Sequence, residues 1–453
     1  MKFLPPNDDI TLYEQGFEDD VLDRAKIGKS LSELVDRIED PLVIALDGQW
    51  GAGKSFFLKR WVGAHKTEND GKAITVYFDA FANDCFGDPL VGLVAALGER
   101  LPKAQTKMKG IRVAAAKVVR PAARAALALA TFGATEALSD LGDAVVGSLS
   151  KDAETAVDSF WKAEEGRRAA MEEFRAAIVA LQKSEGADGD VRPLVIVVDE
   201  LDRCRPDYAL DVLEVIKHFF AVSKVHFILG VNLSALENSV KARYGSEIDA
   251  EAYLRKFINL TFSLPDTVGD YDSKRAIPFY ASHLARKMGL TQKAADYVTD
   301  HLKIVEKTNT ISVRDVGRVM SQISIFPDVV WDEQRTLYGW REAAISLAVA
   351  KMIKPSMYRK FLDATASEAD LRDYFGAPVL VTEEQGETGR NQLYDHKRAI
   401  RLWMWQHLCG ATNSIPERTK PHVIKFFDDW GDIDRPAEIP KKISGLWLDL
   451  FKI

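Results

Sequence analysis

The stretch GQWGAGKS, residues 48–55, fits the pattern G-x-x-x-x-G-K-[ST] and follows the apolar run PLVIAL, residues 41–46. A short continuous apolar run is typical of a buried parallel strand, and SFFLKRWV, residues 55–62, indicates the start of a helix. Because glycine adopts backbone conformations closed to other residues, the loop amides can converge on phosphate oxygens at the helix N-terminus. A strand, a glycine-rich loop and a helix in this order predict a phosphate-binding loop.

The residue types of this loop indicate which of its residues contact a nucleoside triphosphate and which bind the metal ion. Lys54 would reach the β- and γ-phosphates, and the Ser55 hydroxyl would bind Mg²⁺. The other residues expected at the nucleotide in this segment are Gly48, Gln49, Trp50, Gly51, Ala52, Gly53 and Phe56. A chance match to the pattern has no reason to lie between a strand and a helix, so the context favours a working site.

Two further strand ends carry polar side chains that this chemistry needs. The run PLVIVVDE, residues 193–200, indicates a central buried strand that ends in two carboxylates. Asp199 is expected on the metal side, and Glu200 is placed to orient and polarise an attacking water as a general base. The run VHFILGVN, residues 225–232, ends in Asn232, which is either a polar sensor near the γ-phosphate or part of a strand-end turn.

Length, charge and cysteine content narrow the class of protein. With 453 residues, the chain is expected to form two or three domains. A formal net charge of −7 argues against nucleic-acid binding by the chain as a whole. Three scattered cysteines favour a reducing compartment. Because no signal peptide or run of roughly 18–20 apolar residues is found, we expect a cytoplasmic protein without an integral membrane span.

Four stretches of the chain resemble the KAP-type P-loop NTPases, which belong to the AAA+/STAND-like side of the P-loop class. The most specific is VVDELDRCRP, residues 197–206, and the others are residues 22–35, 76–97 and 253–265. The resemblance covers roughly residues 15–330. It implies an α/β fold: a three-layer P-loop NTPase core with a parallel sheet, a helical insertion between the Walker A and Walker B motifs, a helical lid and a C-terminal helical domain.

The resemblance also carries over a nucleotide and individual residues. It implies ATP, and no guanine-specific N/T-K-x-D motif follows the third strand. Ile27 would contact the adenine, and Arg314, in SVRDVGRVM, would be a second sensor of the phosphates. Arg255 lies where such ATPases place a finger that completes a neighbour's site, and Arg203 competes for that role. Each of these arginines could equally belong to an ordinary salt bridge.

The insertion departs from the pattern of relatives, in which it often spans a membrane. No acidic residue occurs from residue 101 to residue 135, and seven basic residues lie between Lys103 and Arg124. The apolar run at 125–134 is too short to cross a bilayer. Three interpretations stay open: a solvated helix leading to a small-residue helix, a basic helix lying on anionic lipid, and a contact with nucleic acid or an anionic protein.

These observations predict five parts and one main activity. The parts are residues 1–100 and 154–265 for the two halves of the core, 101–153 for the insertion, 266–330 for the lid and 331–453 for the C-terminal domain. We expect Mg²⁺-dependent ATP hydrolysis that drives a conformational switch. The family points to a bacterial defence complex against phage or plasmids, with a separate effector or further copies of the chain as partners. The alternative is a nucleotide-dependent scaffold or a nucleic-acid- or membrane-associated signalling NTPase with weak hydrolysis.

Overall fold

The chain folds into two units, which we call the sheet unit and the helical unit. The computed structural model describes residues 2–6, 10–118, 153–184, 191–269, 274–376, 389–428 and 435–449. The sheet unit consists of Ile10–Asp20 and Arg24–Leu264, and the helical unit consists of Met1–Asp9, Val21–Asp23 and Pro265–Ile453. The finer division into five parts stays a prediction.

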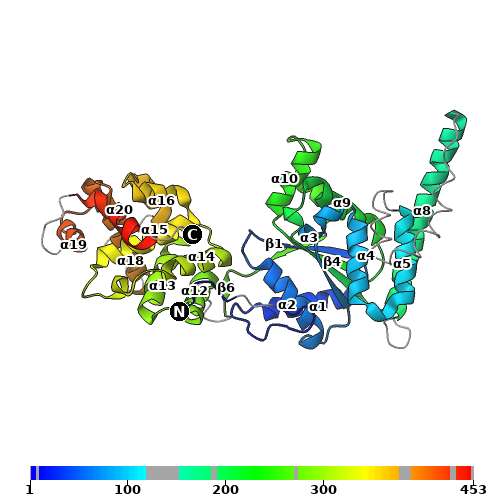
Figure 1. Ribbon diagram of the computed structural model, residues 1–453, viewed down its shortest axis with the longest axis horizontal. Helices are drawn as coiled ribbons and strands as arrows, with labels where there is room; N and C mark the ends of the chain where they lie inside the picture. The colour runs from blue at the N-terminus through cyan, green and yellow to red at the C-terminus, as the bar shows by residue number, and fades with distance from the viewer. Residues whose placement is uncertain are drawn as a thin grey trace. The chain divides into compact units, whose positions relative to one another are not determined.

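A five-stranded parallel sheet forms the centre of the sheet unit (Figure 1). Its strands are β1 (Leu42–Asp47), β2 (Ile74–Asp79), β3 (Leu194–Asp199), β4 (Val225–Val231) and β5 (Leu260–Ser263). Their spatial order is β2-β3-β4-β1-β5. Strand β4 therefore separates the strand before the glycine-rich loop from the strand that ends in the two carboxylates, as expected for a P-loop core with an additional strand.

Alternate residues of strands β1 to β4 enter two different apolar clusters, so the unit has three layers. On β3, Val195 and Val197 face a cluster with α1 (Ala25–Arg37) and α2 (Lys54–Thr67). Leu194, Ile196 and Val198 face the other cluster. That cluster is covered by α4 (Pro89–Arg100), α5 (Gln105–Val118), α8 (Ala153–Ser184), α9 (Pro206–Phe219), α10 (Leu233–Tyr244) and α11 (Ala250–Leu254). A strand that is buried on both faces needs the continuous apolar sequence from which these strands were predicted.

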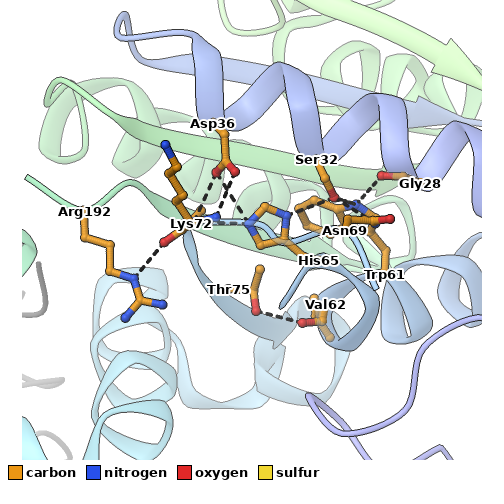
Figure 2. Close-up of polar contacts among 11 residues, drawn as sticks. Gly28, Ser32, Asp36, Trp61, Val62, His65, Asn69, Lys72, Thr75 and Arg192 are labelled. Atoms are coloured by element: carbon orange, nitrogen blue, oxygen red, sulfur yellow. Dashed lines mark hydrogen bonds and ion pairs between the residues drawn. The ribbon is translucent and has the colours of Figure 1, made fainter. Parts of the chain in front are cut away.

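A buried polar network fixes α1 against α2, the helix that follows the glycine-rich loop (Figure 2). Ser32 Oγ accepts hydrogen bonds from Trp61 Nε1 and Asn69 Nδ2, both at 3.1 Å, and lies 2.9 Å from His65 Nδ1. The Ala73 amide donates to His65 Nε2 at 3.2 Å, and the same ring nitrogen lies 3.6 Å from Asp36. Burial also lowers the pKa of His65, so the ring is neutral.

The predicted insertion contributes helix α5 to the sheet unit. Helix α5 packs against α4 and against α8, the helix that follows the insertion, and Figure 1 shows α5 and α8 side by side. Phe174, Ile178 and Leu181 of α8, which recur at helical spacing, are fully buried. Among the described residues, no helix combines the length and apolar character needed to cross a membrane. The apolar run at 125–134 and the basic residues Arg120 and Arg124 lie outside the described residues.

The helical unit is built around its own apolar core. It begins with a short antiparallel pair of strands, β6 (Thr267–Val268) and β7 (Lys274–Arg275). Its helices are α12 (Ala276–Met288), α13 (Gln292–Val305), α14 (Val313–Ser324), α15 (Tyr338–Ile353), α16 (Pro355–Leu362), α17 (Glu368–Phe375), α18 (Gly389–Leu408), α19 (Lys420–Lys425) and α20 (Ile439–Ile443). Trp405 is buried in this core, and Trp403 and Trp447 pack partly buried against it, so these tryptophans serve packing.

Candidate nucleotide-binding site

The polar strand ends meet at one edge of the sheet. In the strand registers, Asp79 lies opposite Asp199, Asp199 lies opposite Gly230, and Asp47 lies opposite Val231. The glycine-rich loop leaves β1 at the same edge, where the Gly48 amide donates to the Val231 carbonyl at 3.2 Å. The loop and the two carboxylates after β3, about 145 residues apart in sequence, therefore meet at the carboxyl edge of the sheet, where open α/β sheets bind ligands.

The glycine-rich loop is curled around its own lysine. Gly51 and Gly53 have φ values of 87° and 89°, in the left-handed region that favours glycine, and α2 begins directly after Gly53. Lys54 Nζ donates to the carbonyl oxygen of Gly48 and, at 3.2 Å, to that of Gln49. Burial lowers the pKa of Lys54, and the carboxylates of Asp202, Asp199 and Asp47 act against that shift. The ammonium therefore lies inside the loop among the carboxylates, where a phosphate would need it.

Two contacts that the sequence did not predict hold the loop in place. The buried Arg24 guanidinium donates to the carbonyl oxygens of Ala52 at 3.0 Å and Gly53 at 3.4 Å. On the other side, Trp50 Nε1 donates to Asp202 at 2.5 Å, which ties the loop to the short turn Leu201–Arg203 after β3. Arg24 is part of the 22–35 stretch that resembles the family, but no pattern in the sequence predicts its contacts with the loop.

Asp199 is the most enclosed carboxylate of this edge, with 1% of its surface exposed. Tyr77 Oη donates to its Oδ2 at 2.7 Å, the Glu200 amide lies 3.0 Å from its Oδ1, and the Ser55 hydroxyl is hydrogen-bonded to it. Burial raises the pKa of Asp199, and the hydrogen bonds from Tyr77 and Ser55 oppose that rise. The Ser55–Asp199 contact joins the two predicted Mg²⁺-binding residues, and their hard oxygen atoms suit a Mg²⁺ ion that is also held by phosphates.

Glu200 follows with a strained backbone and a paired carboxylate. Its φ of 60° lies in the left-handed region, which costs a non-glycine residue on the order of 1–3 kcal/mol. Its Oε1 lies 2.7 Å from Arg203 Nη1. Burial raises the pKa of Glu200, while Arg203 counteracts the rise. Arg203, one of the two finger candidates, is therefore occupied within its own chain.

The remaining predicted residues are placed as follows. Asn232 directly follows β4 at the same edge, and its side chain accepts from the Ala235 amide as the N-cap of α10, while its role as a sensor stays a prediction. Ile27 packs partly buried beside α2, and Phe56 lies half exposed under the Arg60 guanidinium.

The two other arginines belong to different units of the chain. The Arg255 side chain is 71% exposed and forms an ion pair with Glu251. Arg314 belongs to α14 of the helical unit. Their roles as finger and second sensor stay predictions.

The basic part of the insertion is only partly described. Lys107, Lys109 and Lys117 are exposed on α5, and Lys117 forms an ion pair with Glu173 of α8 at 2.6 Å. Among the described residues, no three His, Cys, Asp or Glu side chains gather as a metal site. The three interpretations of the insertion stay open.

The chain matches one family model over the segment that forms this site. The model of the "KAP family P-loop domain" matches residues 24–330, more than half of the chain. A search of the curated proteins found no significant match. Among solved structures, the Aeropyrum pernix ORC2 protein in ADPNP–ADP complexes is similar at 12% identity and a TM-score of 0.36, over 88% of this chain and 89% of that one. The Drosophila ORC bound to GC-rich DNA and Cdc6 is similar at 11% identity and a TM-score of 0.32, over 95% of this chain and 63% of that one. With the family model matched over the segment that folds into the sheet and its glycine-rich loop, the chain belongs to the KAP family of P-loop domains.

Proposed function

We propose that the protein binds ATP with Mg²⁺ and hydrolyses it to drive a conformational switch. The observation that carries this proposal is the convergence of Lys54 and Ser55 with Asp199 and Glu200 at one sheet edge, where the Ser55 hydroxyl is bonded to Asp199. Separate structural explanations would be needed for each residue alone. A single triphosphate site accounts for all four.

Each residue of the site would have a separate role in phosphoryl transfer. The amides of the glycine-rich loop and the N-terminus of α2 would hold the phosphates, and Lys54 would leave the loop carbonyls to bind the β- and γ-phosphate oxygens. Ser55 and Asp199 would hold Mg²⁺, which neutralises charge on the phosphates when bound. Glu200 would accept a proton from the attacking water, for which its raised pKa makes it a better base. Catalysis of this kind is mostly positioning and charge stabilisation.

The Glu200–Arg203 ion pair supports slow basal hydrolysis. A carboxylate held by a guanidinium at 2.7 Å is less free to accept a proton, so release of Arg203 would raise the rate. This contact is also what the alternative, a scaffold with weak hydrolysis, requires. Under both proposals the partner is a separate effector or further copies of the chain, and Arg255 is an exposed candidate for contact with a neighbour.

Two substitutions test the activity. Lys54→Ala is expected to abolish ATP binding, whereas Glu200→Gln is expected to retain Mg·ATP and to lower the hydrolysis rate by at least a hundredfold. Phosphate release and calorimetric titration would be measured on the full chain, with Lys66→Ala as the matched control, because Lys66 is exposed in the last turn of α2, away from the loop. The proposal is wrong if both active-site variants hydrolyse ATP at the wild-type rate.

A role in defence against phage or plasmids is a separate proposal that rests on the family resemblance alone. It predicts that bacteria carrying the intact system resist infection and that Lys54→Ala removes the resistance. Plaque counts over a panel of phages measure this outcome. Equal counts with the wild type and the variant would leave the ATPase proposal intact and remove the defence role.

A further inference from the structure

We propose that Tyr77 is a positioning residue of the metal site, whose hydroxyl holds the Asp199 carboxylate in the orientation that Mg²⁺ requires. This inference rests on the proposed function and adds a residue that neither motif contains. Tyr77 lies on β2, one strand beyond β3, and is separated from Asp199 by 122 residues in the chain. Its role is therefore a property of the fold.

The strand register explains why a tyrosine can perform this task. Tyr77 lies directly opposite Val197, so Asp199 is its diagonal neighbour, two residues further along β3 and on the same face of the sheet. Diagonal neighbours of this kind are roughly 7–8 Å apart, a distance that long aromatic side chains can cover. The hydroxyl at the tip of the ring accordingly lies 2.7 Å from Asp199 Oδ2.

The carboxylate has little room to turn once this bond is made. Its Oδ1 lies 3.0 Å from the Glu200 amide, and a Cβ atom on Gly230 of β4 would come within 2.4 Å of the same oxygen. The Ser55 hydroxyl is also hydrogen-bonded to Asp199. Tyr77 is the only one of these donors that comes from β2, and it fixes Oδ2, the oxygen that the Glu200 amide does not hold.

Tyr77 is itself held in place at the backbone. Its amide donates to Tyr13 Oη at 2.9 Å, and the Arg100 guanidinium lies 4.0 Å from the centre of the Tyr13 ring. Lys59 Nζ lies 5.5 Å from the centre of the Tyr77 ring. A segment near the start of the sheet unit therefore supports the residue that orients the carboxylate.

The competing explanation is that the Tyr77 hydroxyl only stabilises the fold. The two explanations differ in what happens to the metal. Removing a group that is hydrogen-bonded to a metal ligand typically lowers metal affinity by 10–100-fold. A purely structural hydroxyl would instead weaken nucleotide binding to the same degree with and without Mg²⁺.

The test uses the full chain and a non-hydrolysable ATP analogue, whose dissociation constant is measured by calorimetry in EDTA and in Mg²⁺. Tyr77→Phe removes one oxygen atom and leaves the ring. Tyr208→Phe is the matched control, since Tyr208 is buried in the same unit and its hydroxyl has no hydrogen-bond partner among the residues that the structure describes. We expect Tyr77→Phe to reduce the affinity gained from Mg²⁺ about tenfold, with an unchanged constant in EDTA, and Tyr208→Phe to change neither.

A double-mutant cycle with Asp199→Asn covers the case in which Tyr77→Phe folds poorly. In the Asp199→Asn background, the tyrosine has no carboxylate to orient, so Tyr77→Phe is expected to have no further effect on the Mg²⁺ gain. An unchanged gain in Tyr77→Phe alone, or equal effects in both backgrounds, overturns the inference and leaves the ATPase proposal standing. A wild-type chain that binds the analogue in neither buffer overturns both.

Discussion

The glycine in the middle of the site edge offers a sharp test of the geometry. Gly230 lies on β4 directly opposite Asp199, and a Cβ atom at this position would lie 2.4 Å from Asp199 Oδ1 and 2.6 Å from Leu58 Cδ1. Real Cβ atoms do not approach other atoms this closely, so Gly230→Ala must displace a neighbour. Leu58 can turn the end of its side chain. Asp199 cannot move without breaking hydrogen bonds, because its carboxylate is almost fully enclosed.

The size of the effect follows from three terms. Overpacking a closed core costs roughly 1–3 kcal/mol, and a lost hydrogen bond to a charged group costs about 1.5–3 kcal/mol. Replacing glycine by alanine in an extended strand stabilises the fold by about 0.4–1 kcal/mol, because the unfolded chain has less conformational entropy to lose. The net loss of unfolding free energy is therefore about 1.5–5.5 kcal/mol. At about 2–4 °C per kcal/mol for a unit of this size, the melting temperature should fall by roughly 3–20 °C.

The assay compares melting temperature and Mg²⁺-dependent nucleotide affinity for Gly230→Ala and Gly110→Ala. A Cβ atom on Gly110 of α5 meets nothing within 4 Å, so the control should stabilise the helix by about 0.5–1 kcal/mol. The two glycine substitutions are therefore expected to have opposite signs. If Gly230→Ala melts with the wild type and keeps its Mg²⁺ response, Asp199 is not confined as described, and the account of the metal site is wrong.

The remaining predictions concern two residues near the loop and the basic part of the insertion. Burial lowers the pKa of His65. Just below about pH 6.5, His65 therefore binds a proton in the unfolded chain but stays neutral in the folded chain. The neutral His65 therefore contributes its full share to the free energy of unfolding above this pH, and below it the free energy falls by up to about 1.4 kcal/mol per pH unit. His65→Gln should make the urea midpoint decline less between pH 7.5 and pH 5. Arg24→Met removes the guanidinium from the loop carbonyls and should weaken nucleotide binding about tenfold in calorimetry; unchanged affinity would show that the loop needs no brace. If the insertion binds nucleic acid, Lys107→Glu with Lys109→Glu should lower retention on DNA and flatten its salt dependence, whereas equal retention would disfavour that interpretation.

The sequence was sufficient to predict the parts of this site that follow from local chemistry. The strands at 42–47, 194–199 and 225–231 were expected because runs buried on both faces are continuously apolar, and each has its polar residue at the strand end. The glycines that take left-handed angles lie at the positions where the loop must curl. Asn232 shows the limit of such patterns, since a strand-end asparagine suits both a sensor and a turn, and the cap that it forms on α10 leaves its role as a sensor a prediction.

The contacts that could not be predicted are those set by register between distant strands. That Tyr77 reaches Asp199 depends on which residue of β3 lies opposite it, and a shift of one residue would turn the ring to the other face. Gly230 gave a fainter signal, because a glycine within an apolar strand often marks a close approach of another group. The sequence could therefore indicate that something lies close to Gly230 but not that it is the carboxylate. The motifs name the groups that we propose to meet the triphosphate. Their neighbours on β2 and β4 decide how those groups are held, so substitutions at these neighbours test the site most directly.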